Sequence, residues 1–224
     1  MDPTDACSRC ITRNDCAFVN LPRKSPVTGK PLVHERHFQR GEMLREQGAA
    51  SDTVQMIKVG NVLASRSGVD DRPRPVFIIC PGQTVGQFEP TEAGNTLSCR
   101  AISAGRLCEV LLGEIGEAAT EDFRNVLLER NTRTFRLLAD WAQIMRIKGV
   151  TGQVAAALVQ LASSQRVGNV VHLPGHSALA ELLGTSRETI ARVLAQLELK
   201  GALARLDRTH CTINRSKLVA LLAG

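Results

Sequence analysis

The sequence predicts an α+β fold with a β-roll first, a long helix next and a helix-turn-helix at the end. Three observations predict it. Short apolar runs separated by glycines fill residues 38–115, an apolar seam with helical spacing follows over residues 120–147, and two short apolar helices joined by a glycine come last. Strand-like segments followed by helical ones, with no alternation between them, are typical of an α+β chain.

Composition narrows the class of protein. The chain has 224 residues, 43% of them hydrophobic, which gives room for one large or two modest domains. Its net charge of +6 permits a polyanionic partner, while an aromatic content of 3% without tyrosine argues against a single-stranded nucleic acid. No apolar run is long enough to span a membrane, and the start, with Asp2 and Asp5, does not resemble a signal peptide. We therefore expect a cytoplasmic protein.

Residues 1–30 are predicted to form an irregular arm that carries three cysteines. They are spaced as Cys7-x2-Cys10-x5-Cys16, so one short segment can offer three thiolates to a metal centre. Thiols stay reduced in the cytoplasm, so seven cysteines indicate ligands or redox chemistry more than disulfides. The spacing matches neither common ferredoxin pattern. Zinc would usually need a second close pair, and the nearest, His34-x2-His37, flanks a probable strand.

A fourth ligand has to come from outside the arm. Cys80, Cys99 and Cys108 are the candidates in the region of short apolar runs. Cys80 ends the apolar run 76–80 and is better explained as a small buried hydrophobe. Cys211 lies near the C-terminus, far from the arm in sequence, and is expected to be structural.

Residues 31–118 are predicted to form the β-roll. The runs 53–59, 75–80 and 107–112 have strand character, and glycines separate them at intervals that suit short antiparallel strands.

Residues 119–148 are predicted to form a single dimerisation helix. Its seam follows the alternating three- and four-residue spacing of coiled-coil a and d positions, through Leu128, Asn131, Phe135, Leu138, Ala142 and Met145. Such a stripe can pack on its own domain or on a partner helix. We favour a homodimer, because helix-turn-helix proteins commonly pair, and Asn131 would then fix the register at a cost in stability.

Residues 149–224 are predicted to form a helix-turn-helix module with a hinge at residues 149–152 and a short hairpin around Asp207 and Arg208. Gly184 supplies the turn between the two helices, and the second helix should stop near Gly201. From Gly149 onward the sequence contains eight basic and four acidic residues, an excess of positive charge of the kind that contact with phosphates requires.

Three charged residues lie near the start of the second helix, on its non-core side: Arg187, Glu188 and Arg192. In such motifs these positions contact base edges, where arginine grips guanine and glutamate accepts from cytosine. A simpler explanation also holds for Glu188, because Thr185-x-x-Glu188 reads as a capping box.

The stretch Ser186-Arg-Glu-Thr-Ile-Ala-Arg192 resembles the recognition helix of the CRP/FNR family of bacterial transcription regulators. Segments 40–48 and 81–86 resemble turns of that family's sensor domain. The resemblance runs along the whole chain. It implies a β-roll sensor domain (a double-stranded β-helix, cupin-like), a long dimerisation helix and a C-terminal winged helix-turn-helix. It also implies palindromic double-stranded DNA and RNA polymerase as partners.

The cysteine spacing resembles the FNR-type branch in particular. That resemblance implies a [4Fe-4S] cluster held by Cys7, Cys10, Cys16 and Cys108, with oxygen as the signal that removes it. A regulator that senses nitric oxide or thiol redox state is the alternative, and an iron-sulfur redox protein a more distant one. We find no nucleophile elbow, phosphate-binding loop or paired-acid motif, so no enzyme is expected. A cyclic nucleotide is not expected either, because Gln87 and Ser98 stand where nucleotide-binding relatives carry Glu and Arg, although Arg100 could substitute.

Overall fold

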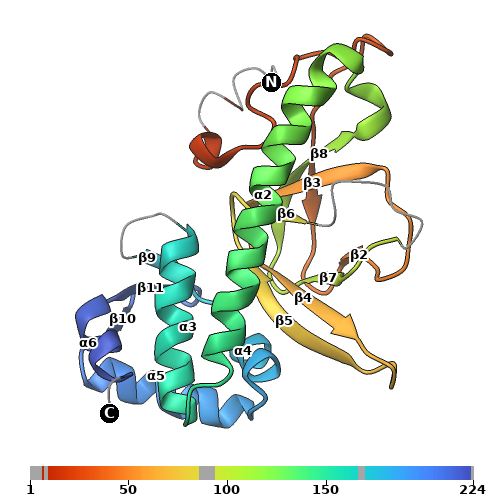
Figure 1. The fold of residues 1–224 in the computed structure, drawn as a ribbon. Helices are drawn as coiled ribbons and strands as arrows, with labels where there is room; N and C mark the ends of the chain where they lie inside the picture. The colour runs from red at the N-terminus through yellow and green to blue at the C-terminus, as the bar shows by residue number, and fades with distance from the viewer. Residues whose placement is uncertain (1–6, 8–9, 86–93, 166–169, 223–224) are drawn as a thin grey trace. The chain divides into compact units, whose positions relative to one another are not determined.

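The fold was obtained as a computed structural model, which describes residue 7 and residues 10–85, 94–165 and 170–222. The chain divides into two compact units (Figure 1). One holds residues 1–73 and 78–135, and the other holds residues 74–77 and 136–224. Each unit is described by itself. No helix in the described part of the chain is long and apolar enough to cross a membrane.

The β-roll that the sequence predicts is built from two antiparallel sheets of four strands each within the described residues. One sheet has the order β1-β8-β3-β6 and the other β2-β7-β4-β5. The strands are β1 (His34–Phe38), β2 (Met43–Arg45), β3 (Thr53–Val59), β4 (Val62–Ser67), β5 (Pro73–Ile79), β6 (Thr84–Val85), β7 (Ser98–Ala101) and β8 (Gly105–Leu111).

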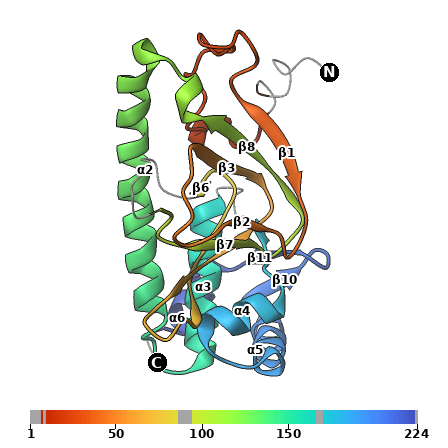
Figure 2. The ribbon, with the colours of Figure 1, turned by 90° about the vertical axis from the view of Figure 1, so that its right-hand side faces the viewer.

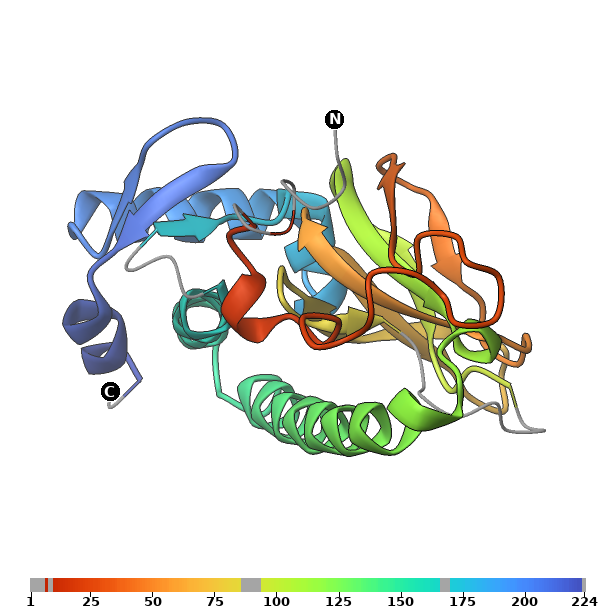
Figure 3. The ribbon, with the colours of Figure 1, turned by 90° about the horizontal axis from the view of Figure 1, so that it is seen from above.

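The two faces of the β3–β8 pair have different neighbours. Paired residues of adjacent strands share a face, and Cys108 of β8 pairs with both Met56 of β3 and Glu35 of β1. The face of Met56 and Cys108 packs against the arm and against α2 (Glu117–Ile144) in one apolar cluster. Figure 3 shows the arm, in red, running beside the first half of α2.

The arm contains the short 3-10 helix η1 (Arg13–Asp15), which brings Cys16 back toward the roll. Phe18 follows it, is buried, and lies 6.2 Å from Phe123 of α2 between ring centroids. A second 3-10 turn, η2 (Leu112–Glu114), leads from β8 into α2. The arm is therefore packed on the roll and on α2.

α2 starts and ends earlier than the predicted 119–148: the helix begins directly after Gly116 and is followed by turns after Ile144. Figure 2 shows it as one continuous helix. Its buried residues include Phe123, Leu127, Leu137 and Trp141. The predicted seam lies on another face, as Leu128 and Phe135 are 63% and 73% exposed.

The second unit holds α3 (Val150–Gln165), β9 (Val170–His172), α4 (His176–Leu183), α5 (Arg187–Leu199), β10 (Leu203–Arg205), β11 (His210–Ile213) and α6 (Arg215–Ala220). The three strands form a sheet in the order β10-β11-β9, which includes the predicted hairpin. The predicted hinge at residues 149–152 is wrong at its end, since Gly152 lies within α3. Only Gly149, with φ +82°, has the left-handed backbone of a turn.

Candidate DNA-binding surface and thiol site

The helix-turn-helix is formed by α4 and α5. Gly184 follows α4 with φ 62° and ψ 37°, a left-handed conformation that glycine adopts at little cost. The predicted core face of α5 is confirmed: Ile190, Val193, Leu194 and Leu197 are all buried. The other side of α5 is therefore free to enter a groove of DNA.

Arg187, Glu188 and Arg192 are exposed on that side of α5. The helix begins at Arg187, so the first two occupy its first turn, the part that reads base edges in this motif. Their positions agree with the expectation from sequence. Their contacts with DNA remain a prediction.

The start of α5 corrects the capping assignment. The N-cap is Ser186, and its hydroxyl accepts a hydrogen bond of 3.1 Å from the backbone amide of Thr189. The box that the sequence suggested, with Thr185 as its cap, is wrong by one residue. Glu188 still interacts with this turn, because a hydrogen bond from its own backbone amide and a second one from Ser186 lower the pKa of its carboxyl.

The β10–β11 hairpin is held by its turn. Asp207 accepts hydrogen bonds from the backbone amides of Thr209 and His210 at 2.6 and 2.8 Å. These bonds lower the pKa of Asp207 well below its usual range, with the amide of Thr209 as the largest cause. Cys211 belongs to β11 of the hairpin and is fully buried, as expected for a structural cysteine. A fixed turn presents Arg208, exposed, at its tip.

Replacing Glu188 by glutamine tests whether this residue reads a base. We expect Glu188→Gln to relax preference at one base pair of each half-site by about 1–3 kcal/mol, because an amide no longer accepts as a carboxylate from cytosine. The measurement is a binding selection on randomised half-sites. Ser186→Ala is the control: it removes the N-cap, costs about 1 kcal/mol of stability and should leave base preference unchanged. An unaltered preference in Glu188→Gln would make Glu188 part of the cap alone.

The second site is a group of thiols where the arm meets the roll. Backbone hydrogen bonds from Arg13 to Cys10 and from Cys16 to Arg13, both 3.1 Å, wind the arm so that these cysteines lie close together. The amide of Cys10 bonds to the carbonyl of Cys7 at 3.3 Å. Cys7 is exposed, whereas Cys10 and Cys16 are partly buried.

Cys108 joins this group from β8. It is 9% exposed, and it interacts electrostatically with Cys16 and Cys10. Burial raises the pKa of the Cys108 thiol to about 12, and burial also raises the pKa of Cys16. Both groups are thus neutral thiols in the absence of a metal.

The rival cysteines lie elsewhere. Cys99 is on β7 in the other sheet, where it pairs with Arg45 and Ala64. Cys80 is completely buried after β5, as expected of a small hydrophobe.

Two cations that sequence reasoning missed lie at the thiol site. Lys58 of β3 interacts electrostatically with Cys108 and Cys10, and its Nζ donates to Glu35 at 2.6 Å. Arg130 of α2 interacts with Cys16. Strand periodicity in the sequence could have identified Lys58, because it lies two residues after Met56 and therefore on the same face of β3. No pattern in the sequence links Arg130 to Cys16.

The thiols are not spaced for one metal ion. Ligand sulfurs around a single zinc lie about 3.8 Å apart, given a Zn–S distance of about 2.3 Å. Among the residues that the structure describes, no three His, Cys, Asp or Glu side chains are close enough to hold one ion. His34 and His37, on β1, therefore do not complete a zinc site there. An iron-sulfur cluster spreads its ligand sulfurs more widely than one ion does.

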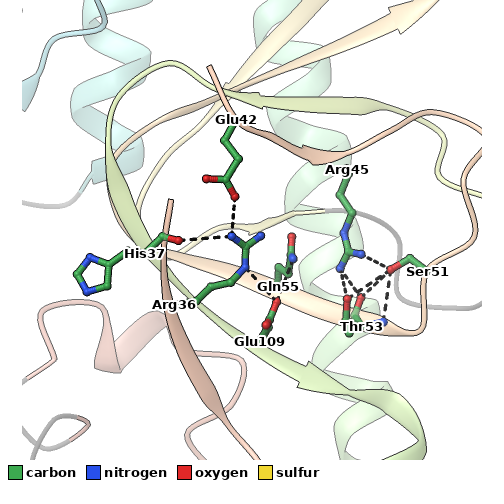
Figure 4. Close-up of polar contacts among 8 residues, drawn as sticks. All are labelled: Arg36, His37, Glu42, Arg45, Ser51, Thr53, Gln55 and Glu109. Carbon is green, nitrogen blue, oxygen red and sulfur yellow. Dashed lines mark hydrogen bonds and ion pairs between the residues drawn. The ribbon is translucent and has the colours of Figure 1, made fainter. Parts of the chain in front are cut away.

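The opposite face of the β3–β8 pair carries a group of hydrogen-bonded polar side chains (Figure 4). Gln55 donates to Glu109 at 3.1 Å, and Arg36 forms ion pairs with Glu109 and Glu42 at 3.5 and 2.7 Å. Arg45 of the second sheet donates to the carbonyl of Thr53 at 2.7 Å and so links the two sheets.

Two of the three residues that the sequence compares with nucleotide-binding relatives, Ser98 and Arg100, lie in the described part of the chain. The Ser98 hydroxyl accepts from the amide of Gln47 at 3.0 Å. Arg100 lies on β7, opposite Met43 and Leu63. Gln87 is outside the described residues.

A roll, a long helix and a winged helix-turn-helix define the class: this is a DNA-binding transcription regulator. Residues 152–221 match the Crp-like helix-turn-helix domain. The chain is 31% identical over 199 residues to the CRP-like cAMP-activated global transcriptional regulator of Mycobacterium tuberculosis, covering 82% of this chain and 85% of that protein. The chain therefore belongs to the CRP/FNR family of transcription regulators, which bind DNA and act as dimers.

Other relatives agree with this assignment. The nitrogen fixation regulation protein FixK of Bradyrhizobium diazoefficiens is 24% identical, covering 97% of this chain and 94% of its own length. The structure of FixK2 from Bradyrhizobium japonicum has the same fold, with a TM-score of 0.70 and 21% identity over 85% of this chain and 97% of that one.

Proposed function

We propose that this protein regulates transcription through an oxygen-labile [4Fe-4S] cluster held by Cys7, Cys10, Cys16 and Cys108. The observation that carries the proposal is the meeting of Cys108 with the arm cysteines. A strand of the roll and the arm, about ninety residues apart in sequence, contribute thiols to one place. The alternative of nitric oxide as the signal uses the same cysteines.

The residues present suit such a group. All the candidate donors are sulfurs, the ligands that iron-sulfur clusters use. Lys58 and Arg130 supply positive charge that favours the thiolate form of cysteines which burial alone would keep protonated. Bound there, the cluster would supply reactivity toward oxygen, while the rest of the response belongs to the chain.

The arm offers a route from the thiols to the dimerisation helix. Asp15, next to Cys16, pairs with Arg133 of α2 at 3.5 Å, and Phe18 packs on Phe123. Ligation at Cys7, Cys10 and Cys16 would hold the arm in this position, and its loss would release both contacts with α2. Such a release shifts a dimerisation equilibrium when the two states differ little in free energy.

A thiol–disulfide switch is less well supported by the same groups. The raised pKa values of Cys16 and Cys108 leave few thiolates for attack on a disulfide or an oxidant.

Anaerobic reconstitution tests the proposal. Protein loaded with iron and sulfide should bind about four irons per chain and show the broad visible absorption of a [4Fe-4S] centre, which air should bleach. Sedimentation and DNA-binding measurements should then indicate a dimer before exposure to air and a monomer after it. A chain that takes up no iron, yet dimerises in response to oxidant, would instead support thiol sensing.

A further inference from the structure

Two histidines face each other across the strands β9 and β11 of the second unit (Figure 1). His172 and His210 are paired in the antiparallel register, and their ring centroids lie 5.0 Å apart with 60° between the ring planes. Their backbone amides bond elsewhere, to the side chains of Gln165 at 2.6 Å and Asp207 at 2.8 Å. The pair is therefore of the non-hydrogen-bonded kind, in which cross-strand side chains approach most closely.

The backbone at both histidines is held by further hydrogen bonds. The side chain of Gln165 also donates to the carbonyl of His172 at 3.1 Å, so it holds this residue through both backbone groups. The carbonyl of His210 accepts from the amide of Leu206 at 2.9 Å, within the hairpin. The two rings thus project from fixed strand positions.

Asp207 orients the ring of His210. The two oxygens of its carboxylate lie 3.1 and 2.9 Å from Nδ1 of His210. A carboxylate only accepts hydrogen bonds, so Nδ1 carries the hydrogen and Nε2 carries the lone pair. Histidines that bind metals are commonly held by a carboxylate in this way. The His210 side chain is 42% exposed, so an ion can reach it from solvent.

The separation of the two rings suits a shared metal ion. Two imidazoles that bind one ion through nitrogens at about 2.1 Å place their ring centres about 5 Å apart. Within the described part of the chain no three His, Cys, Asp or Glu side chains are grouped closely enough to hold an ion. The protein would therefore supply two ligands, and water would complete the coordination. Imidazole suits zinc, copper and nickel ions best.

We propose that His172 and His210 bind a divalent transition metal ion of the zinc, copper and nickel class, with Asp207 as the positioning residue of His210. All three residues belong to the second unit, so this inference goes beyond the function proposed for the thiols and does not depend on it. A contact between two aromatic rings without metal is the simpler explanation of the same geometry, and the experiment has to separate the two.

Such an ion would join the edge of a small sheet to the DNA-binding helix. β9 is the edge strand of the order β10-β11-β9 and has three residues. A metal that bridges β9 and β11 stabilises their pairing, because it binds only where both rings are in place. On the other side of the sheet, Arg205 of β10 pairs with Glu198 of α5 at 3.6 Å. The ion would thus restrain the hairpin beside α5.

The test uses Ni²⁺ on the full-length protein, because its unpaired electrons broaden the NMR signals of nearby residues. His172→Phe keeps an aromatic ring but has no ligand nitrogen. Asp207→Asn keeps an oxygen for the amides of the turn but removes the carboxylate. His176→Gln, in the same unit, is the control. Equilibrium dialysis with reduced thiols measures bound nickel per chain, and backbone amide signals locate it. Nickel held by the thiols is common to all variants.

We expect the amide signals of residues 172 and 210 to broaden in the wild type. His172→Phe should bind one ion fewer per chain, and its signal from residue 210 should stay sharp. Asp207→Asn should lower nickel affinity at this site about 10- to 100-fold, as for other partners of ligating histidines. The ring nitrogen shifts of His210 should at the same time show a changed tautomer, which a merely structural role in the turn would not produce. His176→Gln should match the wild type.

Two results would overturn the site: equal nickel binding by the wild type and His172→Phe, or sharp signals from residues 172 and 210 in nickel-treated wild type. The rings would then only pack on each other. Should His172→Phe disturb the strands without metal, the broadening in the wild type decides alone. Unchanged nickel affinity in Asp207→Asn would overturn the role of Asp207. None of these results bears on iron binding by the thiols, so the two proposals stand or fail separately.

Discussion

Replacing Cys108 by serine is expected to abolish iron binding and, with it, binding of the protein to palindromic DNA. A hydroxyl is a far weaker ligand for iron than a thiolate, and Cys108 is the thiol that connects the roll to the arm. Iron content after anaerobic purification measures the first effect, and a gel-shift assay the second. We expect both to fall to background.

Cys99→Ser is the matched control for this experiment. Cys99 lies in the same roll and is even more deeply buried, at 1% exposed against 9% for Cys108, so the serine carries at least a similar cost of burial. We expect this variant to retain iron and DNA binding. Full iron content in Cys108→Ser would contradict the assignment of the fourth ligand, and loss of iron only in Cys99→Ser would reassign it.

Replacing Phe135 by alanine is expected to weaken the dimer strongly. The side chain is 73% exposed in the single chain, so its removal does not disturb the core of either unit. Burial against a partner helix would make it a central contact, and truncation of such a residue costs about 2–4 kcal/mol of association free energy. This corresponds to a dissociation constant raised about 30- to 1000-fold.

Sedimentation equilibrium of the loaded protein measures the change, and the thermal midpoint of the monomer shows whether the fold is intact. Arg136→Ala, the neighbouring exposed position outside the seam, is the control. A Phe135→Ala variant that dimerises as tightly as the wild type would place the interface on another surface.

Several features followed from local sequence alone. The helix-turn-helix is one, because apolar spacing and a glycine turn act over a few residues, and α4, Gly184 and α5 occur where expected. The strand β3 is another, found at residues 53–59. The order of roll, helix and helix-turn-helix was likewise contained in the change of periodicity along the chain.

Other features needed the tertiary structure. The cap of α5 is Ser186 and not Thr185, because the backbone rotation at the start of the helix selects between two adjacent hydroxyls. The exposure of the seam is a further case. Spacing gave the stripe through Phe135, but only packing determines which stripe of α2 faces the roll, and Phe123 and Leu127 take that place.

The thiol site shows most clearly which features the sequence determined and which ones only the tertiary structure decided. The sequence by itself determined that three cysteines of the arm lie within one turn-rich segment, since their spacing is short. It left Cys99 and Cys108 as rivals, because each lies in a strand. Strand pairing places Cys108 in the sheet that packs against the arm and Cys99 in the other sheet. Long-range register and packing, which no short window of sequence encodes, also bring Asp15 of the arm to Arg133 of α2.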